Sequence, residues 1–300
     1  MTSDQILQIA NNPSVCLDIF NSSAFLRKIA QDYGSEVLRN ELGKNTFNDT
    51  SGIHGVVDED TLSRLFDMVA AQWKTMGENK PHWSVLSSDE WLPEKLTPEK
   101  LEEFYASGKG EVDLLDCVLN QANVHLPSSA TCMELGCGVG RATQHLARRF
   151  AEVAAVDISP GNLEICRVRM AEQGLSNVTS TLLVRPEAIS ELARCDVFFS
   201  RIVLQHNPPP IQLDLLDRIS KSLNPGGILF FQVITGGTNY SYNAVSHLAN
   251  WQNQRFEMHA LPIPMITKTL SKNGYRLAHT IRDLAGGYGV DSFTLLAVPV

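Results

Sequence analysis

The chain has 300 residues, of which 43% are hydrophobic and 19% are charged. This composition excludes a disordered or fibrous protein and is sufficient for one large α/β domain with a smaller appendage. The formal net charge is −8, and the lysines and arginines are scattered along the chain. Because proteins that bind nucleic acid or anionic membranes need a basic surface, we expect a small-molecule partner and neither nucleic acid nor membrane.

The N-terminus and the cysteines bear on the cellular compartment. The opening "MTSDQILQIANN" has no basic segment followed by a long apolar one, and no apolar stretch approaches the ~20 residues of a membrane span. The six cysteines form no C-x-x-C pair, and several lie in apolar runs, which is typical of reduced, buried thiols. The histidines do not cluster with cysteine or carboxylate at ligand spacing. We therefore expect a cytoplasmic protein without a metal site, and its oligomeric state stays open.

Residues 1–124 are predicted to form a helical N-terminal cap or lid. Apolar residues between 62 and 76 recur at the spacing i, i+3, i+4, i+7 behind the acidic segment "DED" at 58–60. A second helix is predicted at "TPEKLEEFYASG", with Thr97 as N-cap, Pro98 as the first helical residue and Gly108 as the stop. The stretch between these helices is rich in Trp, Pro and Ser and is expected to be an ordered loop.

Trp83 and Trp91 lie in that predicted loop and have two interpretations. Buried tryptophan is common core material, so the two side chains can simply pack the cap onto the main domain. The alternative is that they line a substrate pocket. Both residues are therefore candidates for the pocket wall.

Residues 125–300 are predicted to form a Rossmann-like α/β domain. Strands and helices alternate from about residue 130, and this order favours a parallel sheet covered on both faces. Strands are expected at 131–135, 153–158, 177–184, 195–204 and 228–234, and the tail provides two more. Helices are expected at 141–150, 160–174 and 211–223, with the turn "NPGG" leading into the fifth strand.

A glycine-rich loop follows the first of these strands, with Gly136, Gly138 and Gly140 alternating in "ELGCGVGRAT". Glycine admits positive φ and lets another group touch the main chain, and a loop that leads into a helix presents free N–H groups. Asp157 closes the second strand, where a carboxylate can accept both hydroxyls of a ribose. The loop departs from the dinucleotide pattern G-x-G-x-x-G, because Glu134 beside it would repel a pyrophosphate and suits a cationic or amine-bearing ligand.

The stretch "ELGCGVGRAT" resembles motif I of the class I S-adenosylmethionine (SAM)-dependent methyltransferases, and "LNPGGILFFQV" is similar to the family's lead into its fifth strand. The resemblance covers residues 130 to about 235. It implies a seven-stranded, mostly parallel sheet in the order 3-2-1-4-5-7-6, preceded by a helical cap of the kind found in small-molecule members, with SAM as cofactor. The implied cofactor-binding residues are Glu134, Gly136, Gly138, Gly140, Asp157, Ile158, Glu187 and Arg201. For Glu187, the alternative is an exposed carboxylate at a helix start.

The resemblance places the acceptor at the end of the fourth strand, in "SRIVLQHNPPP". His206 can take a proton from a hydroxyl or ammonium acceptor, because its ordinary pKa of ~6.5 is close to working pH; the alternative is a hydrogen bond to the loop backbone. Asn207 is a second catalytic candidate, with turn formation before proline as the alternative. Pro210 stands where base-methylating members have an aromatic ring, which argues against a nucleic-acid base as acceptor. By resemblance to capped members, Tyr105 closes over the sulfonium, a cation–π contact worth ~0.5–2 kcal/mol.

A second polar group follows the fifth strand, in "TGGTNYSYN" and "RFEMHALPIP". In the family, insertions at this point help to close over the acceptor. Tyr240, Tyr242, Glu257 and His259 are therefore candidates for the substrate pocket. The alternative is ordinary packing of a surface loop.

Three functions remain open from the sequence. The first is a SAM-dependent methyltransferase acting on a small molecule of sugar or natural-product type, which holds acceptor and cofactor in line and excludes water. The second is a methyltransferase-like cyclase that converts SAM into azetidine-2-carboxylate and methylthioadenosine. The third is a non-catalytic SAM-binding protein, because a fold alone does not establish chemistry.

Overall fold

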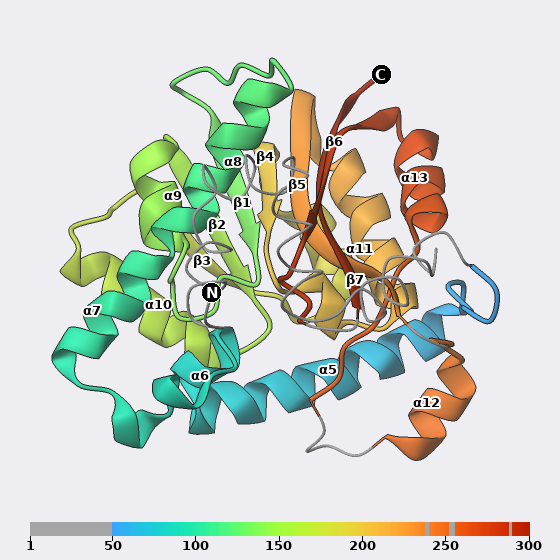
Figure 1. Ribbon diagram of the computed structural model, residues 1–300, viewed down its shortest axis with the longest axis horizontal. Helices are drawn as coiled ribbons and strands as arrows, with labels where there is room; N and C mark the ends of the chain where they lie inside the picture. The colour runs from blue at the N-terminus through green and yellow to red at the C-terminus, as the bar shows by residue number, and fades with distance from the viewer. Residues whose placement is uncertain (1–49, 238–239, 252–255, 288–289) are drawn as a thin grey trace, which may run out of the picture.

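The computed structural model describes residues 50–237, 240–251, 256–287 and 290–300, and within them one seven-stranded sheet carries helices on both faces (Figure 1). The strands are β1 Thr131–Leu135, β2 Glu152–Asp157, β3 Val178–Leu182, β4 Cys195–Ser200, β5 Leu223–Gly237, β6 Tyr275–Asp283 and β7 Val290–Pro299. The helices are α5 Glu59–Asn79, α6 Pro81–Val85, α7 Pro98–Ser107, α8 Lys109–Gln121, α9 Thr143–Arg149, α10 Pro160–Glu172, α11 Pro209–Lys221, α12 Ala244–Asn250 and α13 Ile263–Lys272.

The strand order is β3-β2-β1-β4-β5-β7-β6, which confirms the predicted topology. The first five strands of this order are parallel, whereas β7 is antiparallel to both β5 and β6. The carboxyl ends of the five parallel strands therefore meet at one edge of the sheet, the position at which open α/β sheets bind ligands.

Alternating side chains of the central strands supply two separate cores. Phe198 of β4 and Phe231 of β5 face one core, whereas Phe199 and Phe230 face the other, as the two-residue period of a strand requires. All four phenylalanines are at most 1% exposed. Burial on both faces explains why these strands read as continuous apolar runs in the sequence.

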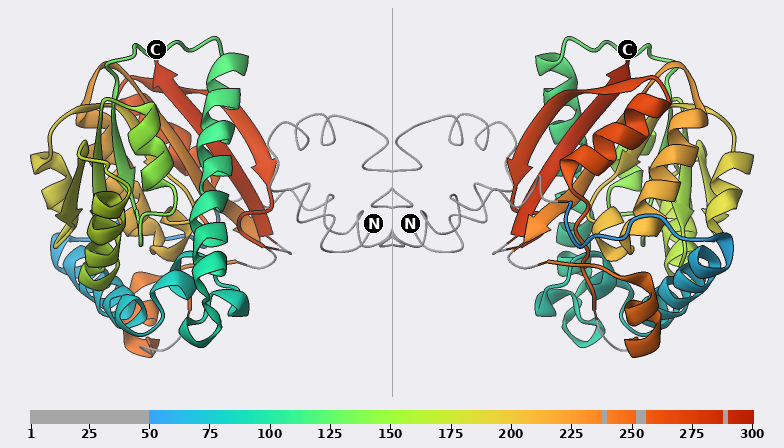
Figure 2. Two further views of the ribbon diagram at one scale, coloured as in Figure 1. Left: turned by 90° about the vertical axis from the view of Figure 1, so that its left-hand side faces the viewer. Right: turned by 90° about the vertical axis from the view of Figure 1, so that its right-hand side faces the viewer.

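The helices divide between the two faces of the sheet. Residues of α11 and α13 pack in the first core, and residues of α8 and α9 pack in the second (Figure 2). Leu115 and Val118 of α8 are buried in the second core, which also contains Phe199 and Phe230 of the sheet. The division into cap and core at residue 124 stays a prediction. Residues 1–49 of the expected cap lie outside the described part of the chain, and α8, which precedes the expected boundary, packs in the core of the sheet domain.

The predicted cap helix is present as α5, which runs along the carboxyl edge of the sheet (Figure 1). The Asp58 side chain caps it by accepting a hydrogen bond from the Thr61 N–H at 2.7 Å. The following stretch differs from the expected loop, because it contains α6 and two short 3-10 turns, Asp89–Trp91 and Pro93–Lys95. The second predicted helix is confirmed as α7, with Thr97 as N-cap, Pro98 as the first helical residue and Gly108 as the C-cap. The φ of Gly108 is −63°, which is helical, and α8 begins at the next residue.

The turn expected at "NPGG" lies inside β5. Gly226 has φ +84°, and the pairing of β4 with β5 shifts register between Cys195 and Val197. A glycine with positive φ lets a strand absorb such an irregularity without ending. The sequence signal for a local bend was therefore correct, but the strand continues through it.

Five described cysteines are free thiols: Cys117, Cys132, Cys137, Cys166 and Cys195. All but Cys117 are buried, as expected, and Cys16 lies outside the described residues. Over the described ranges, none of the helices combines the length and apolarity needed to cross a membrane.

Candidate functional site

A cavity lies at the carboxyl edge of the sheet, between the ends of β1, β2 and β4 and the helices α5 and α6. Its empty space is about 950 Å³, including the part that opens to solvent. The cavity combines apolar walls with a few polar groups, namely Glu134, Asp157 and His206, a composition that is typical of small-molecule sites.

The glycine-rich loop forms the floor of the cavity, and its glycines are needed for two reasons. Gly136, Gly138 and Gly140 have φ of +76°, +54° and +91°, a region that residues with a Cβ rarely adopt. A Cβ at Gly136 would also lie 2.2 Å from Val203 Cγ2, and one at Gly138 would lie 2.5 Å from Val85 Cγ2. Gly136 and Gly138 line the cavity, whereas Gly140 does not.

Asp157 stands at the end of β2 and lines the cavity with 7% of its surface exposed. Its carboxylate accepts hydrogen bonds from Gly138 N at 2.7 Å and Ser159 N at 2.8 Å. Burial raises the pKa of Asp157 despite these bonds. A carboxylate has about four acceptor positions, so this group keeps the capacity to accept ribose hydroxyls.

Glu134 lines the same wall one strand away and is 4% exposed. The Thr143 hydroxyl donates a hydrogen bond to its carboxylate at 2.6 Å. Burial raises the pKa of Glu134 to about 7. A nearby cation would favour the charged form, so this carboxyl is suited to the cationic part of a ligand.

Arg201 lines the cavity, but its guanidinium already has acidic partners. It lies 2.8 Å from Glu111 and 3.5 Å from Asp283, and Arg141 lies 2.7 Å from the same Glu111. Burial opposes ionisation of Glu111, but Arg201 and Arg141 outweigh it and hold its pKa at about 2. These pairs tie α8 to the end of β4 and to the glycine-rich loop, so a structural role accounts for Arg201.

His206 and Asn207 lie at the cavity in and just after the short 3-10 turn Leu204–His206. His206 Nδ1 is 3.0 Å from the Glu257 carbonyl oxygen, and because a carbonyl only accepts, Nδ1 carries the proton and Nε2 is the basic nitrogen. Burial lowers the pKa of His206 to about 4, so the ring is neutral at pH 7. The Asn207 amide donates to Val203 O at 3.0 Å, which is the turn-forming role weighed above.

The opposite wall is helical and largely apolar. Phe66, Val69 and Trp73 of α5 line it together with Ser84 and Val85 of α6. The Trp73 ring meets the His206 ring edge-on at 5.2 Å between centroids. In the sequence, Trp73 is recognisable only as one of the apolar residues on one face of a predicted helix. Because the apolar face of a cap helix is expected to pack against the carboxyl edge of the sheet, this face was the available clue that Trp73 lies at the cavity.

The two tryptophans named from the sequence do not line the cavity. Trp91 is 7% exposed and packs against Phe104 with ring centroids 5.3 Å apart, as in the packing interpretation. Trp83 contacts Phe256, which in turn contacts His206. Trp83 therefore lies one layer behind the cavity wall.

Tyr105 and Glu187 are also placed away from the cavity. Tyr105 is 2% exposed and donates a hydrogen bond to Val139 O, and the cation over its ring, at 4.1 Å, is Arg169. This corrects its expected place at the cofactor. Glu187 lies in the 3-10 turn Pro186–Glu191 and faces Arg218 at 3.5 Å. Ile158, at the end of β2, does line the cavity.

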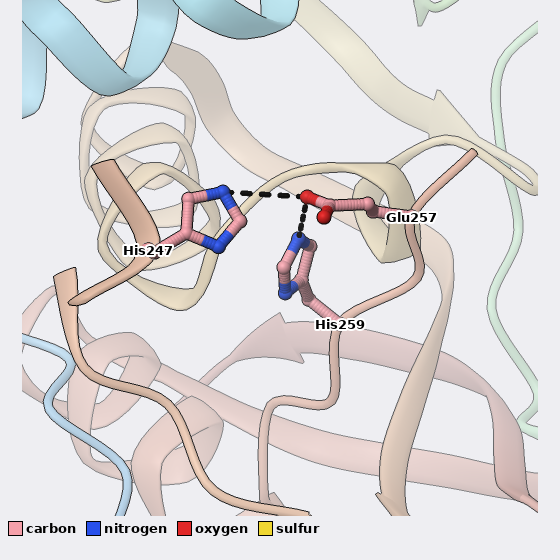
Figure 3. A group of neighbouring side chains, drawn as sticks. All are labelled: His247, Glu257 and His259. Carbon is pink, nitrogen blue, oxygen red and sulfur yellow. Dashed lines mark ion pairs between the residues drawn. The ribbon is translucent and has the colours of Figure 1, made fainter. Parts of the chain in front are cut away.

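The four candidates after β5 gather elsewhere. Tyr240, Tyr242, Glu257 and His259 surround His247 behind His206 and are not part of the cavity wall. The ligand atoms of His247, Glu257 and His259 all lie within 4.8 Å of one another (Figure 3). No ligand spacing in the sequence links these residues, and it is the fold that brings them together.

Comparisons with known proteins agree with this fold. Residues 132–227 match the family model of the methyltransferase domain. Carboxy-S-adenosyl-L-methionine synthase of Geobacter sp. strain M21 is 34% identical over 102 residues, 33% of this chain and 42% of that protein. Ubiquinone biosynthesis O-methyltransferase of Idiomarina loihiensis is 27% identical over 133 residues, 41% of this chain and 54% of that protein. The matched part thus spans about half the length of these relatives.

A solved structure extends the likeness beyond the matched domain. Magnesium protoporphyrin IX methyltransferase from Synechocystis PCC 6803 was solved with bound S-adenosylhomocysteine (SAH). It superposes with a TM-score of 0.55 at 18% identity, over 78% of this chain and 100% of that one. At this identity the similarity shows the fold alone. Together with the family model, it confirms the resemblance to class I SAM-dependent methyltransferases that the motifs indicated.

Proposed function

We propose that this chain is a SAM-dependent methyltransferase that binds its cofactor in the cavity at the carboxyl edge and methylates a small molecule. The observation that carries the proposal is the position of Asp157 and Glu134 on one wall, on either side of the glycine-rich loop. The match of residues 132–227 to the methyltransferase domain supports the reaction class.

The residues at the cavity suit the chemical groups of SAM. Asp157 offers carboxylate oxygens to the ribose hydroxyls, and Glu134 offers negative charge to the amine or sulfonium. Ile158 and Leu183 provide apolar surface for a base. The buried Asn162 Oδ1 has no hydrogen-bond partner within the described chain, so a donor group of a ligand would satisfy it. When bound, SAM supplies an electrophilic methyl group.

The acceptor side is formed by His206 and the helical wall. In the neutral His206 ring, Nε2 carries the lone pair and lies 3.4 Å from the amide nitrogen of Gln205. By exchanging this weak contact, Nε2 can take the proton from a hydroxyl or ammonium as it is methylated. A base with this low pKa holds the proton only briefly, so positioning and exclusion of water carry most of the rate enhancement. Phe66, Val69 and Trp73 provide that exclusion.

The same wall supports a proposal for the acceptor class. Its apolar and aromatic side chains favour a hydroxylated molecule with a flat or aliphatic body over a highly charged one. The name of the Idiomarina relative, a ubiquinone biosynthesis O-methyltransferase, is in line with such an acceptor. The sugar or natural-product type expected from the sequence stays a prediction.

Product analysis tests the proposal. The purified full-length chain is incubated with SAM alone and with a panel of phenolic and other hydroxylated acceptors. The proposal requires SAH together with a methylated acceptor, and loss of both with Asp157→Ala. Methylthioadenosine from SAM alone would identify the cyclase instead. Tight binding of SAM without turnover across the panel would identify a binding protein.

A further inference from the structure

His247, Glu257 and His259 form a compact group behind the cavity wall. Figure 3 shows both imidazole rings turned toward the same carboxylate oxygen. Glu257 Oε2 is 3.3 Å from His247 Nε2 and 3.6 Å from His259 Nε2. His247 lies on α12, whereas the other two residues lie on the extended segment before α13, so the group joins two separate elements.

The donor set is that of a transition-metal site. Two imidazole nitrogens and one carboxylate suit zinc, whereas Mg²⁺ and Ca²⁺ prefer oxygen ligands throughout. The side chains of His247, Glu257 and His259 are 12%, 23% and 8% exposed, so water is largely excluded.

An unsatisfied atom within the group points independently to a missing ligand. His247 Nε2 is buried and makes no hydrogen bond within the described chain, although it lies close to the Glu257 carboxylate. Buried nitrogens are rarely left in this state, because an unmade hydrogen bond leaves the desolvation of the atom uncompensated. A metal ion would use this lone pair.

The surroundings orient the second histidine for the same purpose. The Tyr240 hydroxyl lies 3.1 Å from His259 Nδ1, the ring nitrogen that does not face Glu257. If Nδ1–H donates to Tyr240, Nε2 keeps its lone pair for an ion, as in most metal-bound histidines. The His259 backbone is fixed as well, since its N–H donates to Gln205 O at 2.7 Å.

The distances from the Glu257 carboxylate are close to those of tetrahedral coordination. In a tetrahedral site with metal–ligand bonds of ~2.0–2.1 Å, ligand atoms are ~3.3 Å apart. The two distances from Glu257 are 3.3 and 3.6 Å, and all three ligand atoms lie within 4.8 Å of one another, so side-chain adjustment can bring them to one ion. We propose that His247 Nε2, His259 Nε2 and the Glu257 carboxylate bind one Zn²⁺ ion, with a water molecule or another ligand in the fourth position.

The ion would hold α12 against the segment that supports His206. The carbonyl of Glu257 accepts the hydrogen bond from His206 Nδ1, and Leu261 N donates to Ile234 O of β5. Zinc therefore fixes the back of the cavity wall without entering the cavity. The site is independent of the proposed transferase activity, because its evidence lies in the ligand group alone.

Zinc binding to untagged full-length protein tests the site without an activity assay. The protein is stripped with a chelator, dialysed and titrated with Zn²⁺ or Mg²⁺, and bound metal is measured by mass spectrometry. We expect one Zn²⁺ per chain, a melting temperature several degrees higher with Zn²⁺ than after stripping, and no such shift with Mg²⁺. Binding well below one equivalent, or an equal shift with Mg²⁺, would overturn the proposal.

Variants place the ion at these residues. His247→Gln and Glu257→Gln should each weaken zinc affinity at least tenfold, and Tyr240→Phe, which removes the hydroxyl beside His259 Nδ1, should weaken it by about tenfold. His125→Gln is the matched control, because His125 is exposed and lies outside the group. Circular dichroism establishes that each variant is folded. Zinc retained equally by His247→Gln and His125→Gln in folded protein would place the ion elsewhere.

Discussion

The two walls of the cavity are built from different materials. On the sheet side, recognition depends on fixed backbone and on two carboxylates: Gly138 holds a positive φ, its N–H binds Asp157, and Glu134 is anchored by Thr143. On the helical side, the surface consists of side chains such as Phe66 and Trp73. A buried polar group that loses its hydrogen-bond partner costs free energy in full, whereas the loss of an apolar contact costs free energy roughly in proportion to the area removed. Substitutions on the sheet wall should therefore impair cofactor binding strongly, and those on the helical wall should affect the acceptor more mildly.

The largest effect is expected for Asp157→Ala. Loss of charged hydrogen bonds to the ribose should weaken SAH binding by ~1.5–3 kcal/mol, about 10- to 150-fold, measured by calorimetry. Asp157→Asn keeps an acceptor oxygen for Gly138 N but lacks the charge that binds the ribose hydroxyls. It therefore distinguishes the loss of ligand contacts from the loss of support for the glycine-rich loop. Asp113→Ala, at an exposed ion pair on α8, is the control. Unchanged affinity in folded Asp157→Ala would remove Asp157 from the site.

Gly138→Val should weaken SAH binding more than tenfold, ~1.4 kcal/mol, because the new side chain meets Val85 and the φ of +54° disfavours any Cβ. Gly174→Ala is a matched control, since Gly174 also has positive φ, at +67°, but nothing within 4 Å of a Cβ. Both variants should lose thermal stability, and only the first should lose affinity. An affinity within twofold of the parent for Gly138→Val would show that the loop serves packing alone.

Trp73→Ala tests the helical wall. Trp73 is half-buried and lines the cavity, so removing most of its aromatic surface should lower kcat/KM for the acceptor by about tenfold, whereas SAH affinity should stay within threefold. Trp91→Ala is the comparison, because Trp91 is buried away from the cavity and should affect stability instead. If Trp73→Ala weakened SAH binding as much as Asp157→Ala does, the distinction between the walls would fail.

A smaller effect is expected from the pH dependence of Glu134. Since its pKa is raised to about 7, the charged fraction grows between pH 6 and 8, and affinity for SAM should rise by about fivefold, ~1 kcal/mol, over that range. Glu134→Gln should flatten this dependence. Binding of the parent that is independent of pH would show that Glu134 does not face the cation.

The same carboxyl affects folding stability with a defined sign. Its pKa is 4.5 ordinarily and about 7 in the folded protein, so the unfolded chain releases the proton first as pH rises. Stability is therefore lost progressively between about pH 4.5 and 7. Glu134→Gln removes this loss, so its melting temperature relative to the parent should be higher at pH 8 than at pH 5. The opposite order would contradict the raised pKa.

The parts of the site that are local in sequence were predictable. The strand, glycine-rich loop and Asp157 lie within one β-loop-α-β unit, so spacing and residue type indicate their contacts. The alternation of strands and helices indicated a parallel sheet covered on both faces, and the resemblance to the class I methyltransferases implied the strand order. Prediction failed where distant segments meet. Trp73 lies at the cavity because α5 packs across the edge of the sheet. Tyr105 lies away from the cavity, and its ring contacts the guanidinium of Arg169 on α10.

The group around Glu257 shows the same limit. His247 and His259 belong to different elements, and no ligand spacing in the sequence links them. Only the packing of α12 against the segment before α13 brings their nitrogens to one carboxylate. Gly108 is a smaller example, because a glycine signals the end of a helix but does not show that another begins at once.

A crystal structure of the full-length chain with SAH tests the central claim most directly. The account predicts that SAH occupies the cavity with its ribose hydroxyls within hydrogen-bond distance of the Asp157 carboxylate, while the bond from Gly138 N to Asp157 is kept. It also predicts adenine against Ile158 and Leu183. SAH bound outside this cavity, or bound within it with the ribose turned away from Asp157, would contradict the account.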